Sequence, residues 1–88
     1  MGEVVVLFRL MPHGVETDMN ALAAGVKDAV PDGVRIRGMQ IKDIAFGLKA
    51  LLVAAAMPDA GGILDQMEGA LARVPGVESV EVMEESLV

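Results

Sequence analysis

Two dipeptides recur in this chain in the same order and at nearly the same spacing. Met11-Pro12 returns 46 residues later as Met57-Pro58, and Val30-Pro31 returns 44 residues later as Val74-Pro75. In each half an apolar segment ends at Met-Pro, a helical pattern follows, and Val-Pro closes that pattern. Because proline interrupts both helices and sheet ladders, these positions mark the ends of elements. The repeat therefore predicts two copies of a split β-α-β unit.

The first half contains two predicted strands with a helix between them. Residues Val4–Met11 are apolar on both alternating faces, which is typical of a strand in the interior of a sheet. A helix is predicted over about Asp18–Ala29, and either Thr17 or Asp18 can cap its first turn. Residues Val34–Ile41 alternate apolar with polar and carry arginines on one face, as an edge strand does. Gly38 interrupts this alternation and predicts a bulge.

The middle of the chain is a long, almost uninterrupted run of small and apolar residues, Asp43–Met57. Alanine, leucine and methionine favour helices, so a helix is the competing interpretation of this run. Gly47 near its start and Pro58 at its end favour a strand. We therefore predict one covered strand over this stretch, with Phe46 close to its beginning.

The second half repeats the order of elements. A helix is predicted over about Ile63–Arg73, followed by a strand over Val77–Met83 and a tail over Glu84–Val88. The complete order is β-α-β-β-α-β. We expect an α+β protein of the ferredoxin-like architecture, with a four-stranded antiparallel sheet and two helices on one face. Eighty-eight residues are enough for one such core, so we expect a single domain over residues 1–88.

The composition excludes several classes of function. The formal net charge is −6, which argues against a nucleic-acid-binding protein because such proteins need cations to meet phosphate. The chain has no cysteine, and therefore no disulfide framework and no thiolate metal site. Its start lacks the basic segment of a secretory signal, and no apolar run is long enough to span a bilayer. We expect a cytoplasmic protein with no membrane association.

The sequence offers little for covalent chemistry. His13 is the only histidine, and no acidic residue lies at ligand spacing on the same element. The Gly61-Gly62 pair lacks the Lys-Ser/Thr of a phosphate-binding loop, so a helix-entry turn is the better interpretation. We predict no catalytic set, cofactor or metal, and hence a binding protein. A regulatory ligand-binding module of the ACT kind remains open as an alternative.

Four segments of the chain resemble the archaeal form of translation elongation factor 1-beta. They are Met1–Val6, the strand end at Met11-Pro12, the central Ile44–Leu51, and Gly76–Val82. The resemblance runs through essentially the whole chain in order, and its most specific part is Ile-Ala-Phe-Gly-Leu-Lys at 44–49. It implies a guanine nucleotide exchange factor for the GTPase elongation factor 1-alpha. It also implies action through protein–protein binding, with neither direct nucleic-acid contact nor a cofactor.

The resemblance also implies where the partner binds. The implied partner-binding residues lie at the start of the central stretch: Asp43, Ile44, Ala45, Phe46, Gly47 and Lys49. Phe46 would be an aromatic anchor in the interface, although the same residue could instead pack beneath the helices. Eukaryotic relatives carry a lysine beside the last residue that is implicated in displacing the magnesium ion of the GTPase. This chain ends Ser86-Leu87-Val88, so that role does not transfer to it.

Overall fold

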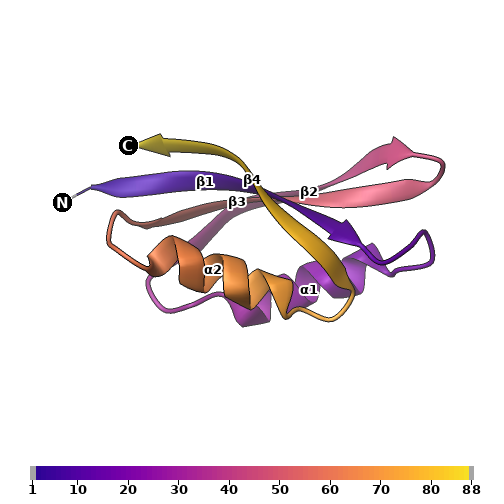
Figure 1. Ribbon diagram of the computed structural model, residues 1–88, viewed down its shortest axis with the longest axis horizontal. Coiled ribbons are helices and arrows are strands. Elements are labelled where there is room, and N and C mark those ends of the chain that lie inside the picture. The colour runs from indigo at the N-terminus through magenta and orange to yellow at the C-terminus, as the bar shows by residue number, and fades with distance from the viewer. Residues whose placement is uncertain (1, 88) are drawn as a thin grey trace.

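The six elements form one antiparallel sheet with both helices on the same side of it (Figure 1). The computed structural model describes residues 2–87, so Met1 of the resembling segment and Val88 of the tail lie outside the described residues. The elements are β1 Glu3–Pro12, α1 Met19–Ala29, β2 Arg35–Ala45, β3 Leu48–Pro58, α2 Ile63–Ala72 and β4 Val77–Leu87. The strand order is β2-β3-β1-β4, which confirms the predicted ferredoxin-like fold.

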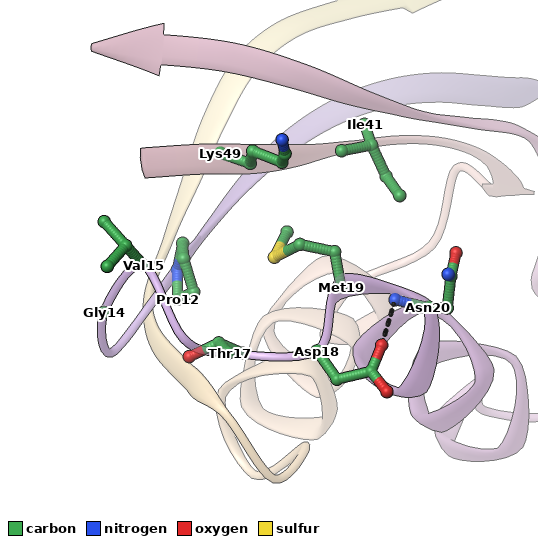
Figure 2. A pocket seen from close by; sticks show the side chains of 9 residues that line it. All are labelled: Pro12, Gly14, Val15, Thr17, Asp18, Met19, Asn20, Ile41 and Lys49. Carbon is green, nitrogen blue, oxygen red and sulfur yellow. Dashed lines mark hydrogen bonds between the residues drawn. The ribbon is translucent and has the colours of Figure 1, made fainter. Parts of the chain in front are cut away.

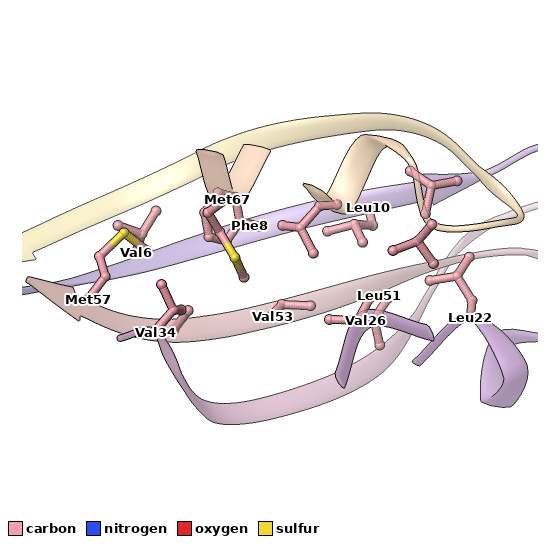
Figure 3. Packing of buried hydrophobic residues seen from close by; sticks show 14 of the residues in the cluster. Val6, Phe8, Leu10, Leu22, Val26, Val34, Leu51, Val53, Met57 and Met67 are labelled. Carbon is pink, nitrogen blue, oxygen red and sulfur yellow. The ribbon is translucent and has the colours of Figure 1, made fainter. Parts of the chain in front are cut away.

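The core lies between the helices and one face of the sheet (Figure 3). Because side chains alternate along a strand, every second residue of β1 and β3 points toward the helices. Val6, Phe8 and Leu10 of β1 have no exposed surface. They pack with residues of β3 and of the two helices: Leu22, Val26, Leu51, Val53, Met57, Met67 and Leu71. The central strands β1 and β3 thus supply nine of the seventeen buried hydrophobic residues of the described chain.

Several local predictions are confirmed. Asp18 caps α1, because its carboxylate accepts hydrogen bonds from the backbone N–H groups of Asn20 and Ala21 at 3.0 and 3.2 Å. The strand β2 is an edge strand, and the shift in its pairing between Ile36 and Gly38 is the predicted bulge.

Neither helix of the described chain is long and apolar enough to cross a membrane.

The prediction of one strand over Asp43–Met57 was wrong. Its first three residues complete β2, Phe46 and Gly47 form a turn, and β3 begins at Leu48. The strand β2 therefore runs four residues beyond the predicted end at Ile41. Apolar residues continue on both sides of the turn, and of its two central residues only Gly47 is a turn former, so composition marks this reversal weakly.

The C-terminal segment is also more ordered than predicted. The strand β4 continues through Leu87 instead of ending at Met83. It pairs with β1 as far as Val4↔Leu87, across a bulge that is opposite Leu7 and Phe8. Acidic residues such as Glu84 disfavour a strand by themselves, but the long β1 supplies backbone partners for the whole segment.

Candidate functional site

The predicted partner-binding residues gather at the tip of the β2–β3 hairpin. This tip lies at the opposite end of the sheet from both chain termini (Figure 1). All six predicted residues are exposed there: Asp43, Ile44, Ala45, Phe46, Gly47 and Lys49. Because the helices do not reach this part of the hairpin, its side chains are free to meet another molecule.

The turn at the tip has an unusual backbone. Phe46 and Gly47 lie between the paired residues Ala45 and Leu48, with φ angles of 53° and 80°. Positive φ at both central residues is the type I′ geometry that best matches the twist of a two-residue hairpin. Glycine adopts it freely, but a bulky side chain in this region costs about 1–2 kcal/mol. Phe46 is the only non-glycine residue with positive φ in the described chain.

The strained backbone of Phe46 does not bring its side chain into the core. Its side chain is 101% exposed, whereas Phe8, the other phenylalanine, is 0% exposed. The alternative in which Phe46 packs beneath the helices is therefore wrong. A strained, projecting aromatic side chain is a feature that folding alone does not explain.

Charged and apolar side chains lie on the two hairpin strands next to the turn. Asp43 and Lys49 are cross-strand partners, and the Lys49 Nζ lies 3.3 Å from the Asp43 carboxylate. Both side chains are open to water, so the pair adds little to stability. A bulge between Asp43 and Ala45 makes Ile44 the extra residue of β2, and Ile44 is 44% exposed.

The structure adds residues that the sequence did not indicate. Val15, in the loop between β1 and α1, is 62% exposed, and its side chain lies next to the backbone of Gly47. Ile41 of β2 is 40% exposed. Together with Ile44 and Phe46, they make up four of the six large, exposed apolar side chains within residues 2–87.

A hollow of about 310 Å³ opens between this loop and the hairpin (Figure 2). Its lining residues come from β1, the loop, the start of α1 and both hairpin strands: Pro12, Gly14, Val15, Thr17, Asp18, Met19, Asn20, Ile41 and Lys49. We call this the loop–hairpin hollow. A large apolar residue in a turn-rich segment is the one sequence signal that could have indicated Val15.

The two other features that the sequence singled out, His13 and the Gly61-Gly62 pair, lie in the two strand-to-helix loops. His13 lies on the surface with its Nδ1 2.5 Å from a Glu78 carboxylate oxygen. In the described part of the chain, no group of three or more histidine or acidic side chains is placed to hold a metal ion. Gly62 is the N-cap residue of α2 and has positive φ, so it forms part of the predicted helix-entry turn. In the described chain, no side chain caps this helix start.

Replacing Phe46 by asparagine should stabilise the fold. Asparagine adopts positive φ readily and favours the first position of a type I′ turn, so the strain is relieved without loss of buried surface. We expect a gain of about 0.5–1 kcal/mol, or about 2–8 °C in melting temperature for a domain of this size. Thermal unfolding followed by circular dichroism measures it, with Phe46→Ala as the control that leaves the strain in place. A melting temperature at or below that of the wild type would mean that the phenyl ring stabilises the fold.

Comparison with known proteins identifies the family. Residues 5–88 match the model of the EF-1 guanine nucleotide exchange domain. The chain is 46% identical to elongation factor 1-beta of Methanoregula boonei, and the match covers 99% of each chain. It is 44% identical to that of Methanococcoides burtonii, with 96% of this chain and 94% of the relative covered. It is 41% identical to that of Archaeoglobus fulgidus over the full length of both.

Two solved structures share the fold at low sequence identity. The ACT domain from GTP pyrophosphokinase of Chlorobium tepidum superposes with a TM-score of 0.65 at 13% identity, covering 92% of this chain and 99% of that one. The C-terminal domain of the MgtC protein from Mycobacterium tuberculosis gives a TM-score of 0.60 at 16% identity, covering 100% and 88%. These likenesses concern the fold alone, whereas the family match and the near full-length relatives concern the sequence. The chain belongs to the EF-1 guanine nucleotide exchange domain family.

Proposed function

We propose that residues 1–88 act as one exchange domain that promotes release of GDP from elongation factor 1-alpha in the cytoplasm. Membership of the exchange-domain family supports this activity. The observation that carries the proposal is Phe46, fully exposed on a strained turn at the end of the molecule. Aromatic residues that enter a pocket on the partner are typical centres of binding energy.

The activity requires binding and no bond-making step. An exchange factor that binds the nucleotide-free GTPase more tightly than the GDP-bound form lowers the affinity for GDP by the same factor. The GTPase holds GDP through phosphate and magnesium contacts, and a partner that favours a conformation with weaker contacts accelerates release. The exposed hairpin tip is a suitable surface for such a partner, and the domain acts without cofactor.

The residues of the tip have distinct roles in this proposal. Phe46 is the anchor, and its strained backbone holds it in a projecting position before the partner arrives, which limits the entropy lost on binding. Gly47 and Ala45 keep the turn narrow. Ile44 extends the apolar contact, while Asp43 and Lys49 provide polar groups at the rim.

The C-terminal strand β4 carries acidic side chains and no lysine. Among these, Glu84 and Glu85 would repel the phosphate groups of a nucleotide site. Lys49, by contrast, lies on the hairpin. We therefore propose that exchange by residues 1–88 uses the hairpin tip rather than β4.

The direct test is release of a fluorescent GDP analogue from the cognate elongation factor 1-alpha in excess unlabelled nucleotide. We expect substoichiometric amounts of this domain to accelerate release, because an exchange factor dissociates and acts again. Spontaneous release without the domain is the baseline, and an unrelated GTPase loaded with the same analogue is the control for specificity. If release from the cognate GTPase does not accelerate while both proteins are folded, the exchange function is wrong. A ligand-binding module of the ACT kind then becomes the better hypothesis.

A further inference from the structure

We infer that the loop–hairpin hollow is a second contact site for the same GTPase and receives an apolar side chain from elongation factor 1-alpha. This inference rests on the proposed function, and it names a part of the interface that the hairpin residues do not include. The tip would insert Phe46 into the partner, and the hollow beside it would accept a side chain in return. Pairs of complementary anchors of this kind are common at the centres of interfaces.

The hollow has apolar side chains from three elements and polar ones beside them. Val15 and Ile41 stand on opposite sides, one from the loop and one from β2, and the side chain of Met19 of α1 lies between them (Figure 2). The polar lining residues are Thr17, Asp18, Asn20 and Lys49. Apolar contacts combined with polar groups are the usual composition of a protein–protein contact site.

The hollow and the hairpin tip form one continuous surface. A Cβ atom added to Gly47 would lie 3.9 Å from a methyl group of Val15, which is ordinary van der Waals contact. Gly47 follows Phe46 directly, and Lys49 contributes both to the hollow and to the ion pair with Asp43. Because Val15 lies against the turn that carries Phe46, a partner seated on this turn is close enough to contact Val15 as well.

A small metabolite or a second copy of the chain fits the hollow less well. Small-molecule sites bury most of their ligand, whereas Val15 and Ile41, on opposite sides of this hollow, are themselves 62% and 40% exposed. Two copies of the chain would each bring a net charge of −6, and this charge disfavours their association. A protein partner that binds the adjacent tip is the occupant that these observations favour.

The test replaces Val15 by serine and measures GDP-analogue release from elongation factor 1-alpha over a range of exchange-factor concentrations. We expect kcat/KM for exchange to fall about tenfold, mainly through a higher KM, because the lost contact contributes to association. The matched control is Met83→Ser on β4, another exposed apolar residue at 48% exposure, whose kcat/KM should stay at the wild-type value. Ile41→Ser, on the opposite wall, should act like Val15→Ser.

The outcomes separate this inference from the proposed function. Wild-type acceleration together with an unchanged Val15→Ser value would overturn the second contact site and leave the exchange function standing. No acceleration by the wild type would overturn the exchange function itself. Sedimentation of the free domain provides a further check, and a dimer that Val15→Ser dissociates would assign the hollow to a second copy instead. Thermal unfolding of each variant checks that the fold is intact, as expected for substitutions of exposed residues.

Discussion

Replacing Phe46 by alanine should abolish most exchange activity and leave the fold unchanged. The ring buries no surface within the domain, so its removal creates no cavity and costs little stability. In the complex, by contrast, loss of a central aromatic anchor typically costs 2 kcal/mol or more. That energy corresponds to a fall of about 30-fold or more in kcat/KM for GDP release.

Two measurements on Phe46→Ala distinguish a loss of binding from a loss of stability. Release of the fluorescent GDP analogue gives kcat/KM, and thermal unfolding gives the melting temperature. Met83→Ala removes a similarly exposed apolar side chain from β4, away from the hairpin tip, and should retain wild-type exchange. If Phe46→Ala exchanges as fast as wild type, the hairpin tip is not the anchor. If it unfolds instead, its loss of activity carries no information about the interface.

Replacing Phe8 by alanine should instead destabilise the fold. Phe8 lies in the middle of β1, is 0% exposed, and packs in the core with residues of both helices and of β3. Phenylalanine-to-alanine changes in cores cost about 3–5 kcal/mol, because apolar surface is lost and a cavity remains. Domains of this kind are stable by only about 5–15 kcal/mol, so Phe8→Ala should remove a large part of that total.

Urea and thermal unfolding of Phe8→Ala measure this loss. We expect the melting temperature to fall by about 12 °C or more, since each 1 kcal/mol shifts it by about 4–8 °C in a domain of this size. Phe46→Ala is the matched control, because it makes the same chemical change at an exposed position. Equal melting temperatures for the two variants would contradict the placement of Phe8 in the core.

The order of elements was predictable because it depends on local patterns. The repeated Met-Pro and Val-Pro pairs mark where strands and helices end, and Asp18 marks where α1 begins. The interior position of β1, which is apolar on both faces, and the interruption at Gly38 in β2 also follow from side-chain patterns. These signals involve residues close together in the sequence, and the structure confirms each of them.

The errors arose where pairing between distant segments decides the structure. The reversal at Phe46 and Gly47 depends on β2 and β3 pairing on either side of it, and one glycine within an apolar run is a weak turn signal. The extension of β4 to Leu87 depends on β1 being long enough to pair with it. In both places a strand partner supplied by the fold outweighs the local preference of the chain.

Some features of the candidate site could likewise be predicted from the sequence, and others could not. The α+β fold followed from the sequence pattern, and the resemblance to a family pointed to the segment around Phe46 as the candidate site. That Phe46 projects into solvent, and that Val15 and Ile41 line one hollow next to the hairpin, is visible only in the folded chain. Periodicity in the sequence reports only which side of an element faces the core. Exposure and proximity depend instead on where the helices end and on which distant loops meet the hairpin.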